Sequence, residues 1–130
     1  MYFLEAVKVC FCKSFVFKGR ASRAEYWLFY AFQWFISFLL IFLSILMMAM
    51  SGTQDVQVGN TGINSLLFIS YLVLLTPNIA VSVRRLHDTN RSGWWFWLNL
   101  LPIIGQLIFL NWLMKPSDNA VNNYGDVPEK

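Results

Sequence analysis

The sequence predicts an all-α integral membrane protein with three transmembrane helices preceded by an N-terminal amphipathic interfacial helix. Three runs without a charged side chain carry this prediction: residues 26–54, 56–83 and 92–114. A bilayer core about 30 Å thick needs roughly 20 apolar residues at about 1.5 Å of helix rise each, so every run is long enough to span. The composition agrees, because 57% hydrophobic and 13% charged residues leave too little polar surface for a soluble globule of 130 residues.

Residues 1–18 are expected to form the interfacial helix. Apolar side chains such as Phe3 and Phe11 alternate there with Glu5 and Lys8. On a helix this spacing partly separates an apolar face from a polar face, which is typical of a helix that lies on the membrane surface.

The first transmembrane helix is expected over about residues 23–50. Ser22 and Glu25 have the spacing of a capping box at its start. In that motif the hydroxyl accepts a hydrogen bond from the backbone N–H of the glutamate, and the carboxylate accepts one from the backbone N–H of the serine. Glycine and polar residues between positions 51 and 62 then form the first connection.

The second transmembrane helix is expected over about residues 63–83. Pro77 predicts a kink within it, because proline has no backbone N–H to donate. Arg84 and Arg85 are expected to end this helix, where cations suit both the helix dipole and the lipid phosphates.

The third transmembrane helix is expected over about residues 94–114, followed by a polar tail over residues 115–130. Pro102 and Gly105 interrupt it, so a re-entrant segment that returns to its own side of the membrane is the alternative. We prefer the spanning form, since non-helical backbone at that depth must be buried in protein or line a water-filled cavity. The spanning form places the tail on the opposite face from the N-terminus.

Basic residues beside these segments predict the orientation. Five precede the first span, none lies in the first connection, and three lie between the second and third spans, at positions 84, 85 and 91. Because cytoplasmic loops are enriched in Lys and Arg, the N-terminus and the second connection are expected in the cytoplasm.

The stretch from Arg84 to Trp95 is the densest polar segment and holds the single histidine. His87 and Asp88 offer an imidazole beside a carboxylate for proton transfer, and arginines can hold a phosphate. In the structural alternative, which we prefer, Asp88 pairs with an arginine, Ser92 caps the third helix and the next glycine provides the turn. A single histidine without a nucleophile or a second metal ligand gives little support for catalysis.

The segment before the first span carries charges that are expected on the same membrane face as this stretch. Four arginines from the two segments would then form a basic ring able to bind anionic lipid headgroups or a phosphorylated ligand. The plainer interpretation is orientation and anchoring alone. The candidate polar and headgroup-binding cluster consists of Arg20, Arg23, Glu25, Arg84, Arg85, His87 and Asp88.

Uncharged polar residues within the spans repeat at helical spacing. They are Gln33, Ser37, Ser44 and Ser51 in the first span and Asn99 and Gln106 in the third. Polar groups in hydrocarbon seek partners, so we expect them to face other helices. A conduction path is disfavoured, because no acidic or basic residue lies within a span to carry ions or protons.

At these motifs the chain resembles the domain of unknown function 805 family of small bacterial inner-membrane proteins. The resemblance lies in residues 17–27 (FKGRASRAEYW), 84–95 (RRLHDTNRSGWW), 101–105 (LPIIG) and 122–128 (NNYGDVP), in which Val127 replaces the acidic residue usual before the proline. It implies an all-helical bacterial inner-membrane protein and implies no reaction, ligand or partner.

We therefore expect a single membrane domain, residues 1–130, that acts as a non-enzymatic interaction or accessory protein through self-association or a larger membrane partner. The alternative is a lipid-binding or transport-related subunit acting as an oligomer, and the least favoured is a membrane-embedded enzyme using His87 and Asp88. Cys10 and Cys12 give two thiols where structural zinc takes four ligands. No metal, cofactor or nucleic-acid motif is predicted.

The orientation predicts a labelling pattern. After replacement of both cysteines, a thiol at Thr53 is expected to react with an impermeant reagent in intact cells, and one at Asn90 is not, because the latter faces the cytoplasm. The reverse pattern would refute the orientation.

Overall fold

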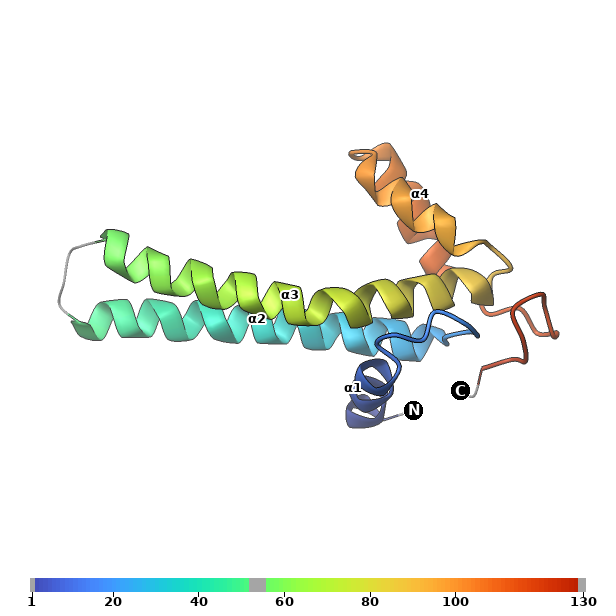
Figure 1. The fold of residues 1–130 in the computed structure, drawn as a ribbon, viewed down its shortest axis with the longest axis horizontal. Coiled ribbons are helices and arrows are strands. Elements are labelled where there is room, and N and C mark those ends of the chain that lie inside the picture. The colour runs from blue at the N-terminus through green and yellow to red at the C-terminus, as the bar shows by residue number, and fades with distance from the viewer. Residues whose placement is uncertain (1, 52–55, 129–130) are drawn as a thin grey trace. The chain divides into compact units, whose positions relative to one another are not determined.

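The computed structural model describes residues 2–51 and 56–128, and these form helices and no strand. The elements in chain order are α1 (Phe3–Cys12), α2 (Arg23–Ser51), α3 (Val56–Asp88), the 3₁₀ helix η1 (Gly93–Leu100) and α4 (Ile104–Met114) (Figure 1). The all-helical prediction is confirmed. The chain divides into two compact units, one made of Met1–Tyr30 with Thr76–Lys130 and the other of Ala31–Leu75.

Helix α2 agrees with the predicted first span almost to the residue. Its start carries half of the predicted capping box, because the backbone N–H of Glu25 donates to the Ser22 hydroxyl at 3.2 Å. The other half is replaced: the Glu25 carboxylate accepts a hydrogen bond from Arg84 instead. Ser22 alone therefore caps the helix, and Glu25 makes a tertiary contact instead.

Helix α3 is longer at both ends than the predicted second span and retains Pro77 inside it. It ends in a Schellman motif, in which the N–H of Asn90 donates to the carbonyl of His87 and that of Arg91 to the carbonyl of Leu86, each at 3.0 Å. Asn90 adopts φ 54°, a left-handed conformation that asparagine tolerates. Because the helix continues to Asp88, Arg84 and Arg85 lie within its last turns and do not end it.

The early start of α3 also shortens the first connection. Helix occupies positions 56–62, which were predicted as loop, and residues 52–55, including Thr53, lie outside the described part of the chain. Among the described helices, two are long and apolar enough to cross a membrane, over Arg23–Met50 and Asn64–Asp88.

The continuous third helix predicted over residues 94–114 is not observed. The segment is divided into η1 and α4, and the chain reverses direction between them. At the reversal the N–H of Ile104 donates to the carbonyl of Pro102 at 2.7 Å around Ile103, which has φ 62° and ψ −71°. This is a γ-turn of the rare kind that strains a β-branched residue. At about 1.5 Å per residue the 11 residues of α4 are too short to cross a bilayer core of about 30 Å.

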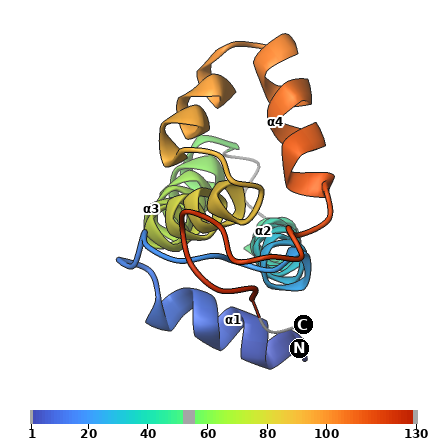
Figure 2. The same ribbon diagram turned by 90° about the vertical axis from the view of Figure 1, so that its right-hand side faces the viewer.

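The two arms of this helical hairpin pack through aromatic side chains. The rings of Trp95 and Trp112 meet edge to face with centroids 5.4 Å apart, and those of Phe96 and Phe109 do so at 6.0 Å. Figure 2 shows η1 and α4 side by side. Ser92 caps η1, as predicted, by accepting from the N–H of Trp94 at 3.4 Å.

The second unit, Ala31–Leu75, is formed by the adjoining parts of α2 and α3. Ser44 is buried in it, and its hydroxyl donates to the backbone carbonyl of Ile41 in its own helix. Ser37 donates to the backbone carbonyl of Gln33 at 3.0 Å and so satisfies its hydroxyl within its own helix. Gln106, in the first unit, is exposed, and the side chain of Ser51 lies outside the described part of the chain.

The hairpin depends on a glycine at the start of α4. A Cβ at Gly105 would overlap the carbonyl oxygen of Leu98 and lie 2.7 Å from the Cβ of Leu101. Gly105→Ala is therefore expected to destabilise the protein by about 1–3 kcal/mol through overpacking, measured by thermal unfolding in detergent.

The matched control is Gly62→Ala in α3, where an added Cβ meets nothing within 4 Å. It is expected to be neutral or slightly stabilising, because alanine favours a helix over glycine. Equal unfolding temperatures for the two variants would contradict the close approach of the two arms.

Candidate functional site

The polar residues singled out in the sequence meet in the first unit, where the start of α2 faces the end of α3. Five of them form a buried set of charges, which we call the arginine cluster: Arg20, Glu25, Arg84, Arg85 and Asp88. His87 lies at its edge, half-buried. Arg23 is exposed and outside it.

Asp88 is the centre of one half of the arginine cluster. Its carboxylate accepts from the Nε of Arg20 at 2.9 Å and from Nη2 of the same guanidinium at 2.8 Å, on one oxygen. The other oxygen pairs with Arg85. Both arginines and the aspartate are almost wholly inaccessible to solvent. Each charge therefore depends on its ion-pair partners to replace the hydration that it loses on burial.

Glu25 and Arg84 form the other half. The Nη1 of Arg84 donates to the carboxylate at 2.6 Å, and the thiol of Cys10 in α1 approaches the same oxygen at 3.8 Å. Burial, followed by the charge of Glu25, raises the pKa of Cys10 to about 12, so this thiol stays protonated at neutral pH. The contact joins α1 to the base of α2 and α3, together with the edge-to-face packing of Phe11 on Phe29 at 5.9 Å.

The end of α4 and the polar tail supply backbone carbonyls to two of the three arginines. Arg85 donates from Nε to Leu113 at 3.1 Å and from Nη2 to Lys115, which satisfies free carbonyls at the end of α4. Arg20 donates to three carbonyls further along, those of Asp118 at 2.6 Å, Ala120 at 2.8 Å and Gly125 at 3.3 Å.

The position of the tail bears on the preferred spanning form of the third segment, which is not confirmed. A full span would place the tail and the N-terminal segment on opposite membrane faces, yet the tail binds Arg20 directly. Figure 2 shows the tail crossing beside the end of α3. The reversal at Pro102 and Gly105 returns the chain toward the end of α3.

His87 is held by contacts that the sequence did not predict. Its Nδ1 lies 3.2 Å from the carbonyl oxygen of Gly19, and its ring stacks on that of Tyr124, with centroids 4.0 Å apart and planes 2° from parallel. Asn122 donates to the backbone carbonyl of His87 at 2.9 Å. Asn122 and Tyr124 belong to the tail motif, residues 122–128, in which part of the family resemblance lies. That resemblance was the one feature of the sequence that singled out these two residues.

The histidine and the neighbouring aspartate take different partners. The carboxylate of Asp88 is bound to Arg20 and Arg85, while the Nδ1 of His87 faces a backbone carbonyl. Within the described parts of the chain, no three His, Cys, Asp or Glu side chains gather closely enough to hold a metal ion.

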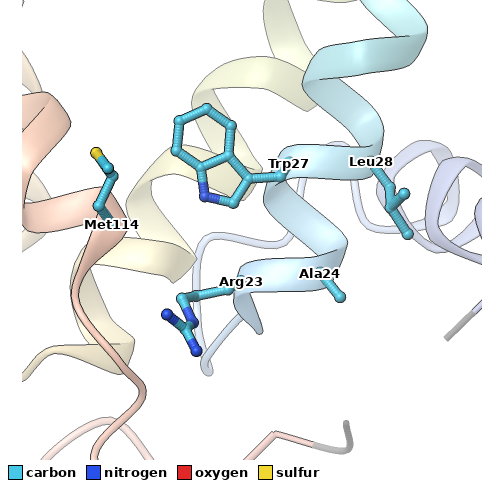
Figure 3. Close-up of a pocket in the computed structure, with 5 residues that line it drawn as sticks. All are labelled: Arg23, Ala24, Trp27, Leu28 and Met114. Atoms are coloured by element: carbon cyan, nitrogen blue, oxygen red, sulfur yellow. The ribbon is translucent and has the colours of Figure 1, made fainter.

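Arg23 is separate from these contacts. It lines an open groove of about 470 Å³ with Ala24, Trp27 and Leu28 of α2 and Met114 at the end of α4 (Figure 3). The basic ring predicted from four arginines is thus not present as an exposed surface, because three are buried and paired and Arg23 alone remains accessible.

Fold and site together define a helical protein with two helices able to cross a membrane and a buried arginine–carboxylate cluster where they meet. The chain matches the family described as protein of unknown function (DUF805) over residues 14–126, and it belongs to that family.

Its relatives include two inner membrane proteins of Escherichia coli strain K12. YhaH is 38% identical over 113 residues, which cover 87% of each chain, and YhaI is 32% identical over 116 residues, 87% of this chain and 86% of the relative. The uncharacterised protein YiiR of the same strain is 32% identical over 102 residues, 78% of this chain and 60% of the relative. No solved structure matches.

The arginine cluster predicts a large cost for removing its central charge. Asp88→Asn leaves Arg20 and Arg85 buried without their counter-ion, so we expect a loss of about 3–5 kcal/mol in stability, seen as a lower unfolding temperature and lower expression.

Asp126→Asn is the matched control, since it makes the same chemical change on an exposed residue of the tail. It is expected to change stability by less than about 0.5 kcal/mol. An Asp88→Asn protein as stable as this control would show that the cluster does not hold the unit together.

Proposed function

We propose that this chain is a small, non-enzymatic accessory protein of the bacterial inner membrane that works by association with itself or with a larger membrane protein. The inner-membrane location rests on YhaH and YhaI, which are named inner membrane proteins, and on the two apolar helices.

The arginine cluster is the observation that carries the non-enzymatic part of the proposal. Its carboxylates bind arginines of the same chain, and two of its guanidiniums bind carbonyls of α4 and the tail. These groups join five segments of the chain. Because they are already engaged with partners of the same chain, they are not positioned to transfer a proton to a substrate. A structural role accounts for the residue types and for their burial.

The topology in this proposal has two spanning helices, α2 and α3, and a re-entrant hairpin made of η1 and α4. The apolar tip of the hairpin supports it, because Leu100, Leu101, Ile103 and Ile104 are all more than half exposed and require a hydrocarbon environment. The N-terminus, the loop after α3 and the tail then share one face, which the basic residues assign to the cytoplasm.

Labelling of the tail tests this topology. A thiol at Asn119, which is exposed, is expected to behave like one at Asn90 and to stay unlabelled by an impermeant reagent in intact cells. Reaction of the Asn119 thiol in intact cells, with Asn90 protected, would restore a full third span.

An exposed stripe on α2 is the surface proposed for association. Phe35, Phe38, Phe42 and Ile45 recur at spacings of three and four residues and are each more than 60% exposed, so they lie on one helix face. A photoreactive residue at Phe42 is expected to form a protein–protein cross-link in native membranes, to a second copy or to a partner resolved by mass.

The control places the same photoreactive residue at Phe15, which is 81% exposed but lies outside the stripe. Cross-links to lipid alone from both positions would show that the stripe only faces the bilayer. The rival enzyme hypothesis predicts that His87→Ala abolishes function with expression and particle mass unchanged, whereas the accessory hypothesis predicts a functional protein.

A further inference from the structure

The groove at the start of α2 combines one free cation with an apolar wall. Arg23 and Trp27 lie one helical turn apart, and Met114 of α4 lies across from the indole (Figure 3). Within the described parts of the chain, Arg23 has no ion pair or hydrogen bond, in contrast to the three arginines of the arginine cluster. The indole N–H of Trp27 likewise donates to no described residue, and Figure 3 shows its nitrogen on the side of the ring toward Arg23.

The ion pairs beside the groove carry an excess of positive charge. The arginine cluster has three guanidiniums against two carboxylates, and Arg23 adds another positive charge beside it. Arg23 is near enough to Arg85 for the two charges to repel. An anion at Arg23 would relieve that repulsion as well as pair with the free guanidinium.

The apolar lining determines the kind of anion. Trp27 and Met114 present hydrocarbon on the side of the guanidinium, and Leu28 extends the apolar lining of the groove, an arrangement that a small hydrated anion does not use (Figure 3). A molecule with a phosphate at one end and an alkyl chain at the other satisfies both parts, since apolar surface is covered while the charge is paired. Tryptophan and arginine at the end of a membrane-crossing helix also lie at the depth of the lipid headgroups.

We propose that this groove binds one anionic phospholipid, with its phosphate on Arg23 and the indole N–H of Trp27 and one acyl chain along Leu28 and Met114. The inference goes beyond the accessory role proposed above and does not depend on it. It differs from the basic ring predicted from sequence, because a single exposed arginine and an apolar groove replace four exposed arginines.

Native mass spectrometry of the full chain in detergent tests the site. The protein is titrated with phosphatidylglycerol, with phosphatidylethanolamine and with inorganic phosphate alone. We expect one tightly bound phosphatidylglycerol, weaker phosphatidylethanolamine and no retained phosphate. Arg23→Gln is expected to weaken phosphatidylglycerol binding about tenfold or more, because a hydrogen bond to a charged group is lost. Arg23→Lys is expected to fall in between, since it keeps the charge without the planar fork.

Lys18→Gln is the matched control, because it removes one exposed positive charge from the same unit outside the groove. Its binding of phosphatidylglycerol is expected to be unchanged, and circular dichroism of all variants checks that the helices are retained. Equal binding by wild type and Arg23→Gln, or equal losses in Arg23→Gln and Lys18→Gln, would overturn the proposal. Arg23-dependent retention of inorganic phosphate as tight as that of the lipid would overturn the choice of a lipid over a free anion.

Discussion

Burial of the arginine cluster is the constraint on which the rest of the first unit depends. A guanidinium or carboxylate removed from water loses several kcal/mol of hydration, so each of these charges requires an opposite charge or a carbonyl close by. Asp88 supplies that for Arg20 and Arg85, and Glu25 supplies it for Arg84. The partners come from segments that are far apart in the chain, so the pairs can form only when those segments are brought together.

The fold-back of the third segment follows from the same requirement. Arg85 has donors left after pairing with Asp88, and the carbonyls at the end of α4 accept from them. That contact is possible only if α4 returns toward the end of α3, which the turn at Ile103 and the close approach at Gly105 allow. The strain of a β-branched residue at positive φ is thus offset by contacts elsewhere in the hairpin and the tail.

The tail completes the arrangement of the first unit. The carbonyls of Asp118, Ala120 and Gly125 bind Arg20, while Tyr124 covers the ring of His87. His87 and Asp88 are engaged in contacts within the chain, whereas Arg23 is exposed beside an apolar groove. The same region therefore has a closed polar interior and an open groove beside Arg23.

The sequence by itself determined the features that depend on local physics. The two long helices follow from the length of apolar runs compared with the thickness of a bilayer, and the start of α2 follows from the Ser22 cap. The interruption at Pro102 and Gly105 was also visible, because proline lacks a donor and glycine permits close approach. The structure that results from this interruption could not be predicted, since a kinked transmembrane helix and a reversed hairpin share the same local sequence features.

The tertiary structure decided which charges are buried and which partner each one takes. Arg20 binds the carbonyl of a residue 100 positions away, and nothing in the neighbouring residues indicates that choice. Four arginines of similar sequence character thus separated into three structural residues and one exposed cation. The physical reason is that the partner of each buried charge depends on how all the neighbouring groups are desolvated together. That burial is a property of the assembled fold and not of any single segment.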